Sequence, residues 1–295
     1  MTKEAVPPLV IIGMHRSGTS MITGMLEEMG LFLGKGKESG NNREHPFFVK
    51  INEWLLDQCR GSWRDPEPIR ALLGHADLRE LVADYLGFYM KTSRAISFLG
   101  WAGYFRYGTP AALDMPWGWK DPRSTYTLPI WLDLFPDAKV VHIMRHGVDV
   151  ANSMKVRTDK GMKRAMEELP ARSRIKYRTL YHRWLEPKLW GFANAIQDGS
   201  LQSGLELWER YLREAHEHVV RLGSRALEFR YEDFLMEPGP VLKKLSDFAN
   251  LAVRESAVVR LAERVRKDRA FAFRKHPHLV AFAEEMGDRL KAWGY

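Results

Sequence analysis

Residues 9–20 read LVIIGMHRSGTS and join an apolar run to a turn bounded by two glycines. The run at residues 9–12 has no polar position, which is typical of a strand buried on both faces of a parallel sheet. Over residues 19–29 the apolar side chains recur at helical spacing, and Gly30 is a suitable stop. A strand, a turn and a helix in this order predict the first unit of an α/β fold.

The turn itself predicts an anion site. Two glycines five positions apart allow a tight bend, so backbone amides and the following helix N-terminus can face a phosphate. A Walker loop carries a lysine directly after the second glycine. This chain has Thr19 there and a cation, Arg16, inside the turn. The pattern favours phosphate binding over ordinary ATP or GTP hydrolysis, and the binding residues it indicates are Arg16, Ser17, Gly18, Thr19 and Ser20.

The rest of the chain alternates between short apolar runs and helical patterns. Strands are expected at 116–120, 138–144 and 226–229, and helices at 47–56, 125–134, 148–156, 205–222 and 240–249. Short helices are expected to cover the sheet at 58–118, and 154–204 is expected to be a helical insertion. The alternation predicts a P-loop-like three-layer α/β sandwich, with a central parallel sheet flanked by helices and right-handed crossovers. The length suits one large α/β domain or two small ones, and a single domain over residues 1–295 is predicted.

The net charge of +8 is concentrated in two segments. Residues 154–190 hold eleven Lys or Arg against four Asp or Glu, and residues 254–275 hold eight against three. Solvated helix faces are the default interpretation of such runs, and a functional role for 154–190 would indicate an anionic partner. A single cysteine, Cys59, excludes an internal disulfide framework. With no targeting or membrane segment visible, a cytoplasmic location is expected.

Four later segments carry further chemistry. VVHIMRHGVDVANS (140–153) ends a strand at Arg145 and reaches Ser153 eight positions on, while WKDPR (119–123) follows an earlier strand. EFRYEDF (228–234) contains Tyr231, and Arg274 and Lys275 form a basic pair near the C-terminus. Together with the turn, and in their order along the chain, these segments resemble the sulfotransferases that use 3′-phosphoadenosine-5′-phosphosulfate (PAPS). The glycine that follows the basic pair in that family is absent here.

The resemblance implies a set of roles. PAPS would be the co-substrate and 3′-phosphoadenosine-5′-phosphate (PAP) the product, with no metal required. Arg145 and Ser153 would hold the 3′-phosphate, which suits the bidentate geometry of a guanidinium. Tyr231 would lie beside the adenine, and Arg274 and Lys275 would close on the 3′-phosphate.

Catalysis would require charge stabilisation and a base. Arg16 is assigned to the bridging oxygen of the leaving phosphate, and Lys120 is the second candidate cation. In NREHPFFVKIN (42–52) an acid is followed by an asparagine eight positions later, which resembles a bacterial form of the family. Glu44 is therefore the first candidate base, His45 the second and Asp121 the third. The alternative for Glu44 is a charge that stabilises a helix N-terminus.

Two other functions remain open at this point. A P-loop nucleotide kinase-like phosphotransferase would need Mg²⁺ and would normally carry a lysine at position 19. A non-enzymatic nucleic-acid or anion binder would suit the basic segments, but no reading motif is present and no nucleic-acid partner is expected. The expected acceptor is a small molecule or glycan, either a carbohydrate or another hydroxylated metabolite. Aromatic side chains in 58–118 and 154–204 could stack on its rings: Trp63, Trp101, Tyr104, Phe105, Tyr177, Tyr181, Trp184 and Trp190.

Overall fold

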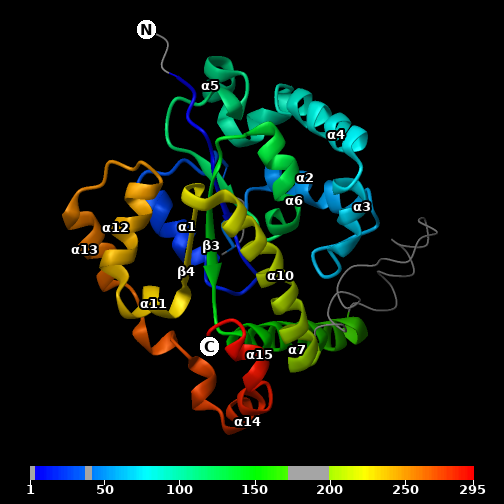
Figure 1. Ribbon diagram of the computed structural model, residues 1–295, viewed down its shortest axis with the longest axis vertical. Helices are drawn as coiled ribbons and strands as arrows, with labels where there is room; N and C mark the ends of the chain where they lie inside the picture. Colours follow the sequence, from blue (N-terminus) through cyan, green and yellow to red (C-terminus); the bar gives the residue numbers. More distant parts are fainter. Residues whose placement is uncertain (1–3, 37–41, 172–198) are drawn as a thin grey trace. The chain divides into compact units, whose positions relative to one another are not determined.

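The structure is a computed structural model that describes residues 4–36, 42–171 and 199–295 (Figure 1). It divides into two compact units. The first comprises Met1–Arg145 and Tyr211–Ala270, and the second comprises His146–Arg210 and Phe271–Tyr295. A single domain over the whole chain stays a prediction.

The first unit is built on a four-stranded sheet (Figure 1). Its strands are β1 (Leu9–Ile12), β2 (Gly118–Lys120), β3 (Lys139–Met144) and β4 (Ala226–Arg230), in the order β2-β1-β3-β4. All three pairings are parallel, with Val10 opposite both Trp119 and Val140. The predicted central parallel sheet is confirmed. β1, β2 and the middle of β3 are buried, as such a sheet requires, whereas the edge strand β4 is mostly half-buried.

One face of the sheet packs on the helix that follows the turn at residues 13–18, called the phosphate turn after the binding predicted for it. Leu9, Ile11 and Val141 share a core with apolar residues of that helix, α1 (Thr19–Glu28). The same core includes residues of α11 (Tyr231–Met236), α12 (Pro238–Phe248) and α13 (Glu255–Glu263). The short helix α11 was not expected. The helical pattern was recognised only from residue 240, although two acids in the first turn of α11 favour a helix start at Tyr231.

The opposite face is covered by aromatic packing. Trp119 of β2 stacks on Phe48 with ring centroids 4.2 Å apart, and the ring centroid of Trp131 lies 4.8 Å from that of Trp119. These partners belong to α2 (Pro46–Asp57) and α6 (Ser124–Leu134), and His218 of α10 (Leu201–Leu222) is tied to α6 through the Thr125 carbonyl. Helices therefore lie on both faces of the sheet, as the three-layer prediction required.

The expected cover at 58–118 is a series of short helices: η1 (Glu67–Ile69), α3 (Arg70–Leu73), α4 (Ala76–Tyr89), η2 (Ser93–Ala95), α5 (Ile96–Tyr107) and η3 (Pro110–Ala112). Glycine and proline breaks keep these elements short. Trp101 and Phe105 stack on each other on α5 and are largely exposed. The short elements η4 (Gly223–Arg225) and η5 (Lys267–Arg269) complete the unit.

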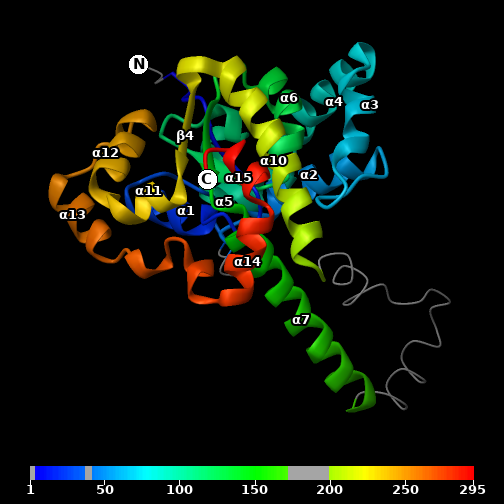
Figure 2. The ribbon, with the colours of Figure 1, turned by 60° about the horizontal axis from the view of Figure 1, so that its bottom comes forward.

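The second unit is helical. It contains α7 (Gly147–Ala171), the N-terminal half of α10, η6 (Ala272–Lys275), α14 (Pro277–Glu285) and α15 (Gly287–Lys291). The expected helix at 148–156 was too short, because α7 continues to Ala171 (Figure 2). Residues 157–168 are mostly good helix formers, and one glycine, Gly161, does not end a helix that they extend.

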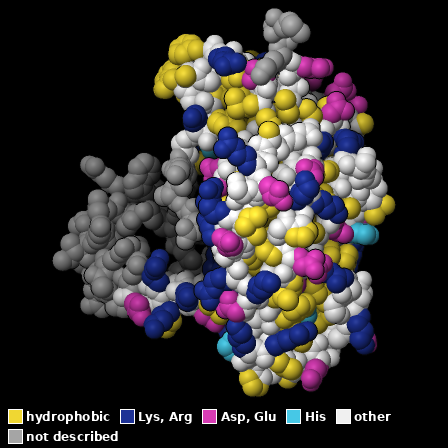
Figure 3. Space-filling model, turned by 90° about the vertical axis from the view of Figure 1, so that its left-hand side faces the viewer, with side chains coloured by type: hydrophobic (Ala, Val, Ile, Leu, Met, Phe, Trp, Pro, Cys, Tyr) yellow, Lys and Arg dark blue, Asp and Glu magenta, His cyan; other side chains and the backbone are white. Residues whose placement is uncertain are grey.

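Two of the eight cations in the basic segment at 254–275 form ion pairs with nearby acids. Arg264 pairs with Glu28 at 2.5 Å, and Arg266 pairs with Asp268 at 2.9 Å. On the face that carries α12 and α13, basic and acidic side chains are interspersed (Figure 3). This fits the solvated helix face expected by default for that segment. In the described ranges no helix is long and apolar enough to cross a bilayer.

Candidate active site

The phosphate turn joins β1 to α1 through three residues with positive φ. These are Gly13 (134°), Arg16 (72°) and Gly18 (89°), and Ser17 N closes the bend by donating to Met14 O at 3.2 Å. A Cβ on Gly13 would lie 2.7 Å from the carbonyl oxygen of Ile143, so the chain passes too close to β3 for a side chain. The glycines therefore fix the shape of the turn.

The end of the turn presents hydrogen-bond donors. Gly18 caps α1 without a side-chain hydrogen bond, and the first turn of the helix holds no acid. The Ser17 hydroxyl is buried and, within the described residues, has no hydrogen-bond partner. Arg16 is exposed at the apex. A buried hydroxyl and a helix N-terminus beside an exposed guanidinium suit an anionic ligand.

Arg145 and Tyr231 lie against this turn. The Arg145 guanidinium stands 4.9 Å above the Tyr231 ring and donates from Nη1 to the Arg16 carbonyl oxygen at 3.2 Å. A Cβ on Gly18 would lie 2.3 Å from the Tyr231 ring, so the ring packs directly on the turn. The ends of β3 and β4 thus bring to the turn two residues that the sequence placed in the same site.

Lys120 joins the turn to the candidate base. Its side chain is 3% exposed, and Nζ donates to Glu44 Oε1 at 2.6 Å, to Asn42 O at 3.2 Å and to Ser20 Oγ at 3.4 Å. Ser20 Oγ in turn donates to Asn42 O at 2.9 Å. The structure therefore brings Glu44 and Lys120 together beside the first turn of α1.

Arg123 belongs to the same network as Lys120 and Glu44, and it was not among the site residues predicted from the sequence. The guanidinium of Arg123 lies 3.6 Å from Glu44 and pairs with Asp121 at 3.0 Å and Glu53 at 2.8 Å. Burial alone lowers the pKa of Arg123, but the charges of Asp121 and Glu53 outweigh it and leave the pKa above its ordinary value. Its place in the WKDPR segment was the available signal.

Asp121 is a buried anchor within this network. The side chain is fully buried and accepts from Asn52 Nδ2 at 2.8 Å and from the Arg123 backbone N at 3.0 Å. Burial raises the pKa of Asp121, against the opposing charge of Arg123. Asn52 is buried as well, and its Oδ1 accepts from Thr127 and Trp131. Asn52 therefore ties α2 to α6 and holds Asp121 below the surface.

His45, the second candidate base, caps a helix. Its Nδ1 accepts from Phe47 N at 3.2 Å at the start of α2, and its Nε2 lies 3.0 Å from the Lys35 carbonyl oxygen. In this arrangement the neutral tautomer donates from Nε2, and both ring nitrogens contact the backbone. His45 thus contacts the backbone, whereas the carboxylate of Glu44 contacts Lys120.

The remaining predicted residues belong to the second unit. Ser153 lies on α7, and Arg274 and Lys275 lie in η6. Asp149, in the first turn of α7, accepts from Ala272 N at 3.1 Å and Phe273 N at 2.8 Å. His146 stacks on Phe273 with ring centroids 4.3 Å apart. Asp149 and His146 thus hold the basic pair beside the helix that carries Ser153.

Several sequence predictions fall on residues 172–198, which lie outside the described residues. They concern the ring-stacking candidates Tyr177, Tyr181, Trp184 and Trp190, together with the C-terminal part of the basic segment 154–190. In the described ranges, no group of three His, Cys, Asp or Glu side chains is arranged to hold a metal ion.

One family model matches more than half of the chain. The model described as "Sulfotransferase family" matches residues 7–189. A sulfotransferase domain from the curacin biosynthetic pathway is 15% identical, with 96% of this chain and 98% of that chain covered and a TM-score of 0.47. A sulfotransferase from Alicyclobacillus acidocaldarius is 16% identical, with 98% and 96% covered and a TM-score of 0.46. No curated protein matches the chain.

Proposed function

This chain belongs to the sulfotransferase family, and on that premise we propose that it transfers a sulfuryl group from PAPS to an acceptor hydroxyl. The observation that carries the proposal is the convergence of Arg145 and Tyr231 on the phosphate turn at Arg16 and Gly18. It supports a site for an adenine nucleotide with phosphates at two positions, because a cation and an aromatic ring lie beside a separate anion-binding turn.

The residues present suit that nucleotide. The turn amides, the Ser17 hydroxyl and Arg16 would hold the 5′-phosphosulfate, since the turn offers donors and no acid. Arg145 would hold the 3′-phosphate, and Tyr231 would support the adenine. Ser153, Arg274 and Lys275 lie in the second unit, and their contact with the 3′-phosphate stays a prediction from the sequence.

The bound nucleotide supplies an activated sulfuryl group whose departure leaves a phosphate oxygen. The bond from sulfur to that oxygen breaks while a bond from sulfur to the acceptor oxygen forms. Arg16 and the amides at the start of α1 would stabilise charge that develops on the leaving oxygen. Lys120 contacts Ser20 in the first turn of α1, so it would also help to stabilise the charge on the leaving oxygen.

Glu44 would accept the proton of the acceptor hydroxyl. Its carboxylate lies between Lys120 and Arg123 and is partly exposed, whereas Asp121 is fully buried. His45 contacts the backbone through both ring nitrogens. A carboxylate within reach of the acceptor side is what general-base catalysis requires.

Calorimetry and a transfer assay test this proposal. PAP should bind without Mg²⁺ and more tightly than ATP with Mg²⁺, and ³⁵S from labelled PAPS should pass to hydroxylated acceptors. A nucleotide kinase would reverse the order of affinity and would transfer phosphate from ATP. The acceptor class within the proposal is a carbohydrate or another hydroxylated metabolite. A cytoplasmic location is also part of the proposal and would be tested by cell fractionation.

A further inference from the structure

A basic pocket opens one residue beyond Glu44. It has a volume of about 430 Å³ and is lined by residues of the loop before α2, of α2 itself, of α4 and of the η2–α5 region: Lys35, Gly36, His45, Pro46, Phe47, Lys50, Tyr89, Ser93, Arg94 and Ser97. This volume suits a small molecule of the size of a monosaccharide or a substituted phenyl ring. All of these residues belong to the first unit.

The charge of the lining has one sign. Three of the ten residues are cations, and no acid of the described chain lines the pocket. Lys35, Lys50 and Arg94 have no ion pair with any described residue, whereas the neighbouring Lys120 and Arg123 are paired with carboxylates. Cations without carboxylate partners around a concave site create a positive potential that attracts anions.

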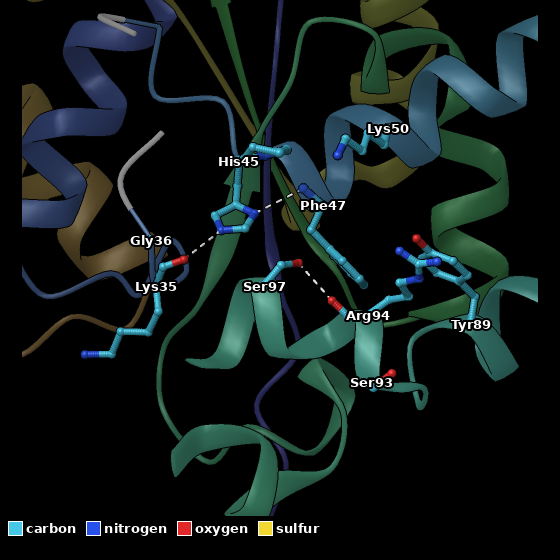
Figure 4. A pocket seen from close by; sticks show the side chains of 10 residues that line it. Lys35, Gly36, His45, Phe47, Lys50, Tyr89, Ser93, Arg94 and Ser97 are labelled. Carbon is cyan, nitrogen blue, oxygen red and sulfur yellow. Dashed lines mark hydrogen bonds between the residues drawn. The ribbon is translucent and has the colours of Figure 1, made fainter. Parts of the chain in front are cut away.

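The positions of the basic groups differ within the pocket (Figure 4). In this view Arg94 of η2 and Tyr89 lie at one side of the pocket, Lys50 of α2 lies at its upper edge, and the ammonium of Lys35 extends away at the opposite side. Tyr89 stacks with Phe47, their ring centroids 5.8 Å apart. Lys50 and Arg94 therefore line the same pocket as an aromatic pair on which a ring could lie.

The backbone around the pocket is held in place. Lys35 N donates to Phe98 O at 2.6 Å, and the Lys35 carbonyl oxygen lies 3.0 Å from His45 Nε2. His45 also caps α2, whose first turn contains no acid, so the partial positive charge of the helix N-terminus adds to the potential. The pocket thus adjoins the candidate base through the single peptide bond from Glu44 to His45.

From these observations we infer that the acceptor of the proposed transfer carries an anionic group, a carboxylate or a sulfate, which Lys50 and Arg94 bind in this pocket. The inference rests on the proposed function, because it assigns the substrate class of that same site. The ring or sugar of the acceptor lies against Tyr89 and Phe47, and its hydroxyl is directed to Glu44.

Matched pairs of probes test this inference. Calorimetry would compare 4-nitrophenyl β-D-glucuronide with the uncharged glucoside, and 4-hydroxyphenylacetate with its amide. In at least one pair the anion should bind about 10-fold more tightly, the value of one charge-assisted contact. The variant Lys50→Gln/Arg94→Gln should reduce that preference to less than about 3-fold, whereas the charge-matched control Lys243→Gln/Lys244→Gln on α12 should keep it.

Two results would overturn the inference: no anion preference in either pair, or a preference that survives in Lys50→Gln/Arg94→Gln. A PAP titration of the same samples separates this inference from the proposed function. If PAP does not bind, the proposed function is contradicted. If PAP binds and neither pair shows an anion preference, only the anionic acceptor is contradicted.

Discussion

Lys120 Nζ lies 2.6 Å from the Glu44 carboxylate and 3.4 Å from the Ser20 hydroxyl in the first turn of α1. One buried ammonium therefore joins the phosphate turn to the residue proposed as the base. Lys120 and Glu44 are 76 residues apart in the sequence. Because Lys120 ends the short strand β2 next to β1, the sheet itself carries this cation to the turn.

Removing Lys120 should slow transfer more than it weakens nucleotide binding. We expect Lys120→Met to lower kcat by about 100-fold, the usual loss of one donor that stabilises developing charge. Single-turnover kinetics with PAPS would measure this. PAP affinity should fall far less, and an equal loss of both would contradict the assignment.

The same change should also destabilise the fold, since it leaves Glu44 without its shortest contact. Breaking a buried pair by removing one partner costs about 3 kcal/mol. The double variant Lys120→Met/Glu44→Gln should therefore have a higher Tm than Lys120→Met alone. A lower Tm in the double variant would show that the two side chains stabilise the fold independently.

Glu44→Gln should act on the chemical step. Loss of a general base lowers turnover by about 100-fold to 10,000-fold, while PAP binding should change little because the proposed base would act on the acceptor and not on the nucleotide. Glu53→Gln is a matched control, because Glu53 also pairs with Arg123 but is half exposed. Similar kcat values for the two variants would exclude Glu44 as the base.

Arg145 should bind the 3′-phosphate of PAP. A lysine cannot reproduce both the stacking on Tyr231 and a bidentate contact, so Arg145→Lys should weaken PAP binding by about 10-fold. AMP lacks the 3′-phosphate, and its affinity should stay within a factor of about two, since no such contact is lost. Calorimetry with both nucleotides makes the comparison. An equal loss for AMP and PAP would assign Arg145 to the turn instead.

Asp149 should act through the basic pair that it positions. Asp149→Ala frees the amides of Ala272 and Phe273, so PAP affinity should fall as much as in Arg274→Gln/Lys275→Gln. Combining all three changes should add little, because residues that act as a unit are not additive. Asp159→Asn, an exposed acid on the same helix, provides the control. Full additivity would show that Asp149 acts independently of the pair.

Local sequence patterns predicted much of the fold correctly. The apolar runs specified β1 and β3 to within a residue, and the glycines at 13 and 18 specified the turn, because these signals depend on neighbouring residues alone. The helix predicted at 148–156 ended too early, although apolar residues at 162, 165, 166 and 169 continue the helical spacing into the expected helical insertion. The helix α11 was missed because it is too short to show a period.

The sequence by itself determined the order of strands and helices, the glycine-bounded turn after β1 and the residue types available around it. Only the tertiary structure decided that Lys120 pairs with Glu44, that Asp121 is buried and that Lys50 and Arg94 share a pocket. The physical reason is that a backbone preference acts over a few residues, whereas these contacts join elements that meet only when the sheet forms and its helices pack on it.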